Sequence, residues 1–424
     1  MKWPVASLEN LISLEYGVGL RAANRNPSGQ VPVAGSNGID GYHSEALVEG
    51  PGIVVGRKGS AGKVTWFDTD FWPIDTTYYV RPKTHTNLRW IFYLLRFLKL
   101  DRLAIVTGVP GLNRNDAYRI KVPFPPVAEQ GRIVEILDQA EALRKKRAEA
   151  DAKAERILPA LFYTMFGDPV TNSKGWDRTP LKKLLRKKKG ALQSGPFGSN
   201  LHNSDFVEDG TVLAVGIDNV HDSGFQIGRN RRISAGKYQQ LKKYQLEPGD
   251  VLITIMGTVG RACVFPEWAG EAICTKHVYR IQTDRNFLDP EYLCASIRFS
   301  SVVRAQLGSS VTGQIVDAIT SKDLVELLVD VPPPGIQNLF AQIKELIDHV
   351  AMRLREVKLR LDQLFSDLLH GAFSGDLTAK WREEHMEELL EEMRERAKVL
   401  ESRVFYDSEQ QLSLYPRIPG SASQ

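Results

Sequence analysis

The sequence predicts an α+β protein in which two α/β modules are arranged by pseudo-two-fold symmetry around two long antiparallel helices that form a coiled coil. The first observation is an internal repeat. Pro125, Gln130 and Phe166 correspond to Pro332, Gln337 and Phe373, a constant offset of 207 residues. The second observation is that each half begins with short β-like runs separated by Gly, Asn and Pro. The third is that each half ends in a long stretch with heptad spacing of apolar residues.

The composition is that of an ordinary multidomain globular protein. The 424 residues are 42% hydrophobic and 25% charged, with a net charge of +4,. Such a mild charge neither predicts nor excludes a nucleic-acid partner. The three cysteines form no even framework, which favours a reducing cytoplasm,. The N-terminus has no apolar signal core, and no apolar run approaches the ~18 residues of a membrane span, so no membrane partner is expected.

Residues 1–122 form the first predicted module. Runs at 52–55 and 77–80 read as strands, and residues 88–103 read as a helix,. Prolines at 123, 125 and 126 then end the module,. The segment 123–168 is predicted to hold a central helix from Val127 to Phe166, roughly 60 Å long at 1.5 Å per residue.

The second half repeats this plan. After a polar linker, 169–175, the second module runs to residue 331, with strands expected at 211–215, 251–255 and 273–281 and a helix at 290–307. The segment 332–376 holds the distal helix, which ends at Phe373. The last segment, 377–424, is a helix from Trp381 to Val404 and a tail. The narrow apolar seam of that helix predicts contact with a partner protein; the alternative is a solvated helix. This seam comprises Met386, Leu389, Met393, Ala397 and Leu400.

The two long helices carry matched apolar rows with alternating steps of four and three. The predicted coiled-coil seam of the central helix is Ile136, Ala140, Leu143, Arg147, Ala150, Ala154, Ile157 and Leu161. In the distal helix it is Ile343, Ile347, Val350, Leu354, Val357, Leu361, Leu364 and Leu368. Antiparallel packing would place Ala140 against Leu364, Ala150 against Leu354 and Ala154 against Val350, small against large. The alternative is two separate core helices or an oligomerisation surface.

A glycine turn followed by a basic residue occurs in both modules. Gly59-Ser60-Ala61-Gly62-Lys63 in the first corresponds to Gly257-Thr258-Val259-Gly260-Arg261 in the second. Neither copy has Walker A spacing. We expect Lys63 and Arg261 to contact nucleic-acid phosphates, because backbone N–H groups and a cation at a tight turn suit an anion. The alternative is a simple hairpin turn.

Basic, amide and hydroxyl side chains cluster in both modules and are of the types that grip phosphates and read base edges. The candidate DNA-binding residues of the first module are Arg21, Asn24, Arg25, Asn37, Arg57, Lys58, Ser60, Lys63, Asn113 and Arg114. Those of the second module are Ser199, Asn200, Asn219, Arg231, Thr258, Arg261 and Lys276. A solvated surface charge is the alternative for each one taken singly.

No catalytic or metal-binding set stands out. Gly-x-Gly-x-x-Gly, His-Glu-x-x-His and Gly-x-Ser-x-Gly motifs are missing, and no acid and base residues are doubled with the repeat,. Cys263, Cys274 and His277 lack a Cys-x-x-Cys pair and have no counterpart in the first half, so they are expected to be ordinary cysteines and not zinc ligands,. We therefore expect no catalytic residue, metal or cofactor in this chain.

Three further motifs are found along the chain: Pro125-Pro126-Val127-Ala128-Glu129-Gln130, Ser194-Gly195-Pro196-Phe197-Gly198-Ser199-Asn200-Leu201 and Ala372-Phe373-Ser374-Gly375-Asp376-Leu377. Through these motifs and its two-copy plan, the chain resembles, to about residue 380, the specificity (S) subunits of type I DNA restriction-modification enzymes. The second Pro-Pro motif departs from the family pattern, because Gly335-Ile336-Gln337 replaces the usual acid-Gln.

This resemblance implies two target-recognition domains, each reading one half of a bipartite, asymmetric site in double-stranded DNA. It implies that the two conserved helices set the spacing and dock two modification (methyltransferase) subunits. Restriction/translocase subunits are further implied partners. S-adenosylmethionine, ATP and Mg are then expected in the partner subunits and not in this chain. The alternatives are the specificity chain of a fused restriction-modification enzyme, a stand-alone DNA-modifying enzyme and a protein scaffold that binds no DNA.

Overall fold

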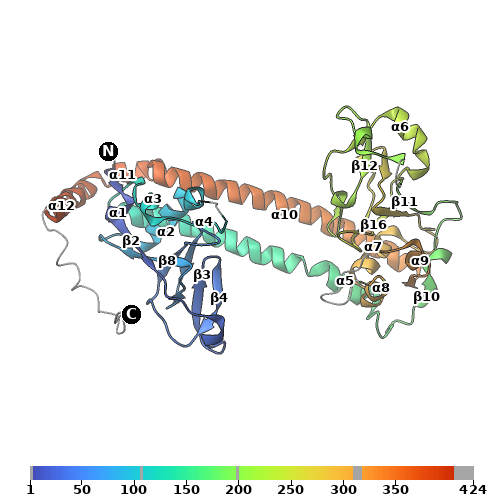
Figure 1. Cartoon of the computed structure of the whole chain (residues 1–424), viewed down its shortest axis with the longest axis horizontal. Helices are drawn as coiled ribbons and strands as arrows, with labels where there is room; N and C mark the ends of the chain where they lie inside the picture. Colours follow the sequence, from blue (N-terminus) through green and yellow to red (C-terminus); the bar gives the residue numbers. More distant parts are fainter. Residues whose placement is uncertain (1–2, 106–107, 197–199, 309–317, 405–424) are drawn as a thin grey trace. The chain divides into compact units, whose positions relative to one another are not determined.

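The computed structural model describes residues 3–105, 108–196, 200–308 and 318–404 (Figure 1). It divides into two compact units, residues 1–147 with 357–424 and residues 148–356. Each unit contains one of the repeated modules and parts of both long helical segments. Ser199 and residues 405–424 lie outside the described residues, as do the side chains of Ala397 and Leu400.

The module of the first unit holds nine strands and three α-helices. The strands are β1 (Val5–Ser7), β2 (Ile12–Tyr16), β3 (Val31–Gly35), β4 (Gly38–His43), β5 (Gly52–Gly56), β6 (Val64–Phe67), β7 (Trp72–Pro73), β8 (Thr77–Pro82) and β9 (Lys121–Pro123). The helices are α1 (Leu8–Leu11), α2 (Leu88–Leu98) and α3 (Arg114–Tyr118). Short 3-10 turns are η1 (Ala22–Asn24) and η2 (Leu100–Leu103).

The module of the second unit is longer. Its strands are β10 (Asp177–Pro180), β11 (Leu192–Ser194), β12 (Val212–Val215), β13 (Val220–His221), β14 (Gly224–Phe225), β15 (Arg232–Ile233), β16 (Val251–Thr254), β17 (Ala262–Val264), β18 (Ala272–Cys274), β19 (Val278–Ile281) and β20 (Leu328–Val331). Its helices are α6 (Ala235–Gln240), α7 (Pro290–Phe299), α8 (Ser301–Gln306) and α9 (Ser321–Val325). Its 3-10 turns are η3 (Leu181–Lys183), η5 (Asn203–Asp205), η6 (Ile217–Asn219), η7 (Lys242–Tyr244) and η8 (Glu267–Ala269).

The two modules share one sheet topology. A four-stranded antiparallel sheet has the order β2-β8-β5-β6 in the first and β11-β19-β16-β17 in the second. A three-stranded sheet has the order β4-β3-β7 and β15-β12-β18, with one antiparallel and one parallel pair in each. Strand β1 pairs with β9, as β10 pairs with β20, so both ends of each module meet. The predicted α+β class with two repeated α/β modules is confirmed.

The long helical segments also match, with one difference. The distal helix is continuous as α10 (Pro334–Ser374), whereas the central segment is divided into α4 (Val127–Ala154) and α5 (Ile157–Phe166). The prediction of one unbroken helix over 127–166 was wrong. Pro159 has no N–H to donate to the carbonyl of Glu155, so the helical hydrogen-bond ladder is interrupted just before α5,.

Within the first unit, α4 and α10 run antiparallel. Arg144 donates to Asp362 at 2.7 and 2.9 Å, and its guanidinium lies 4.6 Å from the Phe365 ring centre. Four residues earlier in α4, Ala140 packs in the same core as Leu368, which lies six residues later in α10. In the second unit, α5 packs against the start of α10 through Phe162, Phe166 and Phe340.

The predicted seam is in the wrong phase at every second position. About half of the predicted seam residues are partly covered. They are Ala140, Arg147, Ala154, Leu161, Ile343, Ile347, Leu354, Leu361 and Leu368. The other positions, Leu143, Ala150, Ile157, Val350, Val357 and Leu364, are exposed, and Ile136 is less buried than its neighbour Leu137.

The covered positions lie one residue further along the chain: Leu137, Arg144, Asp151 and Leu158, and Ala351 and Phe365. Choosing seam positions by apolar identity missed Arg144 and Asp151, because charged side chains can occupy a seam when they are paired or extend to solvent. The expected contacts of Ala140 with Leu364, Ala150 with Leu354 and Ala154 with Val350 are therefore not supported.

A buried glutamine joins each module to its long helix, and this accounts for the repeated Pro-Pro motif. Gln130 is fully buried; its Oε1 accepts the Asn87 N–H at 2.9 Å and its Nε2 donates to the Pro125 carbonyl at 2.9 Å. Asn87 in turn caps α2 by accepting from the Arg89 and Trp90 N–H groups,.

Gln337 does the same in the second unit. Its Oε1 accepts the Asp289 N–H at 2.8 Å, and its Nε2 donates to the carbonyls of Pro332 at 2.7 Å and Phe287 at 2.9 Å. Asp289 caps α7. In both units, therefore, one side chain links the cap of the module's helix to the proline turn that starts the long helix.

An ion pair beside each glutamine links the same two helices, with its charges exchanged. Arg89 of α2 bonds Asp138 of α4 at 2.8 Å in the first unit. In the second unit, Glu291 of α7 and Lys344 of α10 lie 3.1 Å apart, and Lys344 also bonds Asp348 at 2.6 Å. In both copies, an ion pair joins the module's helix to the long helix, but the residues that form it differ.

The segment after α10 packs on its own unit. Glu129, fully buried, accepts from Trp3 Nε1 at 2.7 Å, Thr378 Oγ1 at 2.6 Å and Arg382 Nε at 2.7 Å. Arg382 belongs to α11 (Ala379–Glu384), which leads into α12 (Met386–Val404). In α12, Leu389 is buried and the Glu392 carboxylate accepts the N–H groups of Val127 and Ala128 at the start of α4.

The narrow seam of α12 was expected to face a partner protein or solvent, and the structure shows that α12 also packs on its own unit. The reason is that Glu392 neutralises the unsatisfied N–H groups at the N-terminus of α4. Whether the rest of the helix contacts a partner stays a prediction.

We predict that Gln130→Ala lowers the free energy of unfolding of the first unit by about 1–3 kcal/mol, because the buried Asn87 N–H loses its acceptor. Gln139→Ala, the matched control on the exposed side of α4, should change it by less than about 0.5 kcal/mol,. Urea unfolding followed by tryptophan fluorescence measures both. Equal midpoints for the two variants would contradict the assigned role of Gln130.

We predict that Leu137→Ala costs about 2–5 kcal/mol, the range for emptying a buried leucine site, because Leu137 is fully buried,. Leu143→Ala should cost less than about 1 kcal/mol, because Leu143 is 55% exposed,. Thermal unfolding of the two variants compares them directly. If Leu143→Ala were the more damaging, Leu143 and not Leu137 would belong to the seam.

Candidate nucleic-acid interface

The two Gly-x-x-Gly turns are hairpin turns with the same backbone hydrogen bonds. In the first module, the Gly56 N–H donates to the Lys63 carbonyl and the Gly62 N–H to the Gly56 carbonyl, both at 2.8 Å. In the second, the Thr254 N–H donates to the Arg261 carbonyl and the Gly260 N–H to the Thr254 carbonyl, both at 2.9 Å. All four motif glycines have φ between +75° and +82°, a region that side chains disfavour,. Both motifs therefore form hairpin turns, as the alternative interpretation expected. Each turn holds its basic residue at a fixed position.

The turn of the first module is joined to the β3–β4 hairpin. Lys63 Nζ donates to the backbone carbonyl of Asn37 at 2.8 Å and to its Oδ1 at 2.7 Å. Lys63 and Asn37 are both exposed, whereas Ser60 between the glycines is half-buried. The structure therefore brings three predicted residues of separate segments together at one exposed corner.

Two further predicted arginines share one aromatic ring. The Arg57 guanidinium lies 5.3 Å from the Tyr16 ring centre and that of Arg114 lies 4.8 Å from it. Arg57 also donates to the Asp75 carbonyl, and Arg114 to the Leu14 carbonyl. These bonds position both cations without neutralising them, since carbonyl acceptors carry no net charge,. Lys58, next to Arg57 in the chain, is exposed.

The remaining predicted residues of the first module lie elsewhere. Arg21 and Asn24 are exposed at η1, and Arg25 pairs with Asp40 of β4 at 3.0 Å, so its charge is matched. Asn113 is exposed, but its Oδ1 caps α3 by accepting the Asn115 N–H at 3.0 Å. These contacts give Arg25 and Asn113 local structural roles.

In the second module, Thr258 and Arg261 lie on the β16–β17 turn. The Thr258 Oγ1 is buried and has no hydrogen-bond partner in the described part of the chain. Lys276 is exposed in the loop that follows β18, next to His277, whose carbonyl accepts the Ile255 N–H at the base of the turn. Asn200 is exposed, and Ser199 lies outside the described residues.

The prediction that Asn219 contacts DNA was wrong. Asn219 is fully buried; its Oδ1 accepts the Gly216 N–H at 2.9 Å and its Nδ2 donates to the Gln226 carbonyl at 3.0 Å. An amide is favoured at such a position because it supplies both an acceptor and donors. The sequence shows Asn219 next to Asp218, but the burial of the Asn219 amide depends on contacts that form only in the folded chain.

Arg231 is paired with the carboxylate of Asp218. Although burial opposes ionisation of Asp218, the Arg229 N–H and the Arg231 guanidinium together hold the pKa of this carboxyl below its usual value. Because the pair matches the charge of Arg231, this arginine is a weaker candidate for phosphate contact than Arg261, whose side chain has no carboxylate partner in the described residues.

No group of three or more His, Cys, Asp or Glu residues within the described ranges could hold a metal ion. Cys263 and Cys274 are buried, and burial raises the pKa of each thiol to about 12. Both thiols are therefore protonated near neutral pH, and thiols in that state are poor metal ligands.

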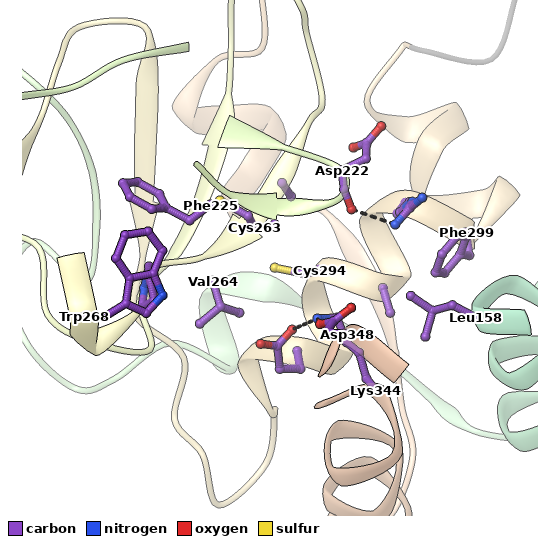
Figure 2. A pocket seen from close by; sticks show the side chains of 16 residues that line it. Leu158, Asp222, Phe225, Cys263, Val264, Trp268, Cys294, Phe299, Lys344 and Asp348 are labelled. Atoms are coloured by element: carbon purple, nitrogen blue, oxygen red, sulfur yellow. Dashed lines mark hydrogen bonds and ion pairs between the residues drawn. The ribbon is translucent and has the colours of Figure 1, made fainter. Parts of the chain in front are cut away.

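Two hollows lie beside the β16–β17 hairpin of the second module. Figure 2 shows the first, of about 180 Å³, with Phe225 and Trp268 on one side and Lys344 and Asp348 of α10 on another. The second is a cleft of about 550 Å³ between the turn and the helices α7 and α8. Its lining comprises Asp222, Thr258, Val259, Gly260, Arg261, Ile297, Arg298, Phe299 and Arg304. Inspection of the sequence missed Arg298 and Arg304, which lie on helices with no turn motif nearby.

Comparison with known proteins matches residues 2–151 to the family described as the type I restriction modification DNA specificity domain. The chain is 23% identical over 295 residues to the EcoBI specificity subunit of a type I restriction enzyme from Escherichia coli; the match covers 62% of this chain and 60% of that subunit. It is 20% identical over 338 residues to a putative type I specificity subunit of Haemophilus influenzae, covering 78% and 83% of the two chains.

The fold is similar to solved structures as well. A type I restriction-modification S subunit from M. genitalium superimposes with a TM-score of 0.58 at 15% identity, covering 88% of this chain and 96% of that one. A chain from a structural study of type I R-M system assembly and conformational transition gives a TM-score of 0.55 at 18% identity, covering 89% and 98%.

We predict that Asn219→Ala lowers the stability of the second module by about 1–3 kcal/mol, because the Gly216 N–H and the Gln226 carbonyl lose their partner in a buried place. Differential scanning calorimetry measures the loss. Asn230→Ala, at an exposed asparagine of the same module, is the control and should be nearly neutral,. An Asn219→Ala protein of unchanged stability would show that the buried amide does not support this loop.

Proposed function

This chain belongs to the family of type I restriction specificity subunits, and we propose that it selects the DNA sequence on which such an enzyme acts. Each module would read one half of a bipartite, asymmetric site in double-stranded DNA. The observation that carries the proposal is the repeated sheet topology with a basic residue at the same hairpin position, Lys63 in one copy and Arg261 in the other.

The chemistry of these positions supports contact with DNA. Lysine and arginine at one position preserve the charge but differ in hydrogen-bond geometry, which suits a phosphate contact better than a base contact. Beside Lys63, the amide of Asn37 and the guanidinium groups of Arg57 and Arg114 are of the kinds that meet base edges and phosphates,. The modules thus offer both kinds of contact.

In the same proposal, α4, α5 and α10 hold the modules at a set spacing and dock two modification subunits. Exposed apolar residues of α10 support the docking. They fall at intervals of seven and four residues along that helix: Leu339, Leu346, Val350, Val357 and Leu364. Such a row on one helix face is typical of a protein-contact surface.

Catalysis would belong to the partners. The modification subunits would use S-adenosylmethionine, and the restriction/translocase subunits ATP and Mg. No helix in the described ranges has the length and apolar character that a membrane crossing requires, and we propose a cytoplasmic location. A specificity chain within a fused restriction-modification enzyme is a variant of the same function.

We predict that exchanging residues 1–122 for the first module of another family member changes one half of the methylated site and leaves the other half and the gap unaltered. The strand pair β1–β9 closes the module, so its ends are together and the exchange keeps both junctions. Methylome sequencing of cells carrying the hybrid with its modification subunits is the measurement. Altered methylation in both halves would refute the independence of the modules, and unaltered methylation would refute DNA reading by the first one.

A further inference from the structure

We propose that the cleft between the β16–β17 turn and the helices α7 and α8 binds the DNA backbone through Arg261 and Arg298. The inference rests on the proposed DNA-reading function and adds one residue, Arg298, and a defined place to it. The cleft is assigned to a phosphate of double-stranded DNA and not to a base edge.

The charge of the lining supports an anion. Arg261 and Arg298 line the cleft together with one aspartate, Asp222. Neither Arg261 nor Arg298 forms an ion pair with a carboxylate in the described part of the chain. Arg298 donates to the backbone carbonyl of Asp222 at 2.6 Å, the contact drawn from Asp222 in Figure 2. This bond positions the guanidinium and leaves its charge unmatched.

A buried hydroxyl supplies a second observation. Thr258 Oγ1 lines the cleft, is buried and has no hydrogen-bond partner in the described residues. A buried hydroxyl without a partner costs free energy, and phosphate oxygens are acceptors that would satisfy it. The hydroxyl and the guanidinium groups are therefore donors around one hollow.

The first module has an arginine at the corresponding helix position, but there the charge of the arginine is paired with a carboxylate. Arg96 lies nine residues after the cap Asn87 of α2, just as Arg298 lies nine residues after the cap Asp289 of α7. Arg96 pairs with Glu141 of α4 at 3.3 Å and packs over Phe92 and Phe365. Its charge is matched inside its own unit, whereas that of Arg298 is not. The cleft is thus a property of the second module.

The test measures binding of the full-length chain to a short, fluorescein-labelled DNA duplex of random sequence over a range of salt concentrations. Random sequence is sufficient because phosphate contacts do not depend on sequence. We expect Arg261→Ala and Arg298→Ala each to lower the slope of log affinity against log salt by about one unit, and the double variant by about two. Arg298→Lys should keep the slope, since it keeps the charge.

Two controls make the result specific. Arg96→Ala removes an arginine from the corresponding helix position and should leave the slope unchanged. Asp222→Asn removes the one carboxylate of the cleft and should tighten binding, the opposite direction. Arg261 and Arg298 are only partly buried, so we expect each variant to fold, and thermal unfolding of each checks this.

The outcomes separate the cleft from the proposed function. If the wild-type chain does not bind duplex DNA at low salt, both are wrong. If it binds and the double variant keeps the wild-type slope, DNA reading stands and the cleft assignment is overturned. Inorganic phosphate at constant ionic strength is the third arm. If it raises the unfolding temperature of the wild type and not of the double variant, while the DNA slopes are equal, the cleft holds free phosphate and not DNA.

Discussion

The buried glutamine at the start of each long helix is the interaction on which the architecture depends. Gln130 and Gln337 each satisfy the N–H of a capping residue and a carbonyl of the preceding proline turn. The prolines end the module and remove N–H donors, which leaves carbonyls that need partners. One amide, with an acceptor and two donors, meets these needs in a place closed to water. The Arg89–Asp138 and Glu291–Lys344 ion pairs lie beside it, so the orientation of each module on its own helical segment follows from the glutamine together with these pairs.

Around that fixed contact the two copies have diverged in charge. Arg89 and Glu291 occupy the same position after the helix cap and carry opposite charges, while their partners, Asp138 and Lys344, lie at neighbouring positions of the repeat. Arg96 is paired with Glu141, whereas Arg298 has no carboxylate partner in the described residues. In the second unit, burial raises the pKa of Glu291, whereas, although burial opposes the charge of Lys344, the carboxylates of Glu291 and Asp348 raise the pKa of that lysine. The pair holds α7 on α10. Duplication kept the backbone geometry and left the side chains free to differ.

Gly62 shows why the hairpin turns resist change. A Cβ there would lie 2.1 Å from the Asp101 nitrogen, so η2 could not approach the turn. Gly260 meets no such neighbour, yet keeps a φ of +82° because the same backbone hydrogen bonds close the turn. The turn is thus conserved between the copies by backbone conformation, while its basic residue, Lys63 or Arg261, varies. A fixed backbone with a variable basic residue is what we expect of a turn whose role is to hold a positive charge in place.

The repeat, the main strand runs, the proline stops and the ends of the two long helical segments could be predicted from the residues, because each depends on spacing or on a local backbone restriction. The break between α4 and α5 was not predicted. The resemblance to type I specificity subunits followed from the same motifs. The phase of the seam could not be predicted, since Arg144 and Leu137 are covered only because the partner helix and the module lie on that side. The burial of Asn219 and the cleft at Arg298 could not be predicted either. Both depend on segments that are distant in the chain and meet only in the folded protein, where charge pairing and exclusion of water decide which polar side chains remain available to a ligand.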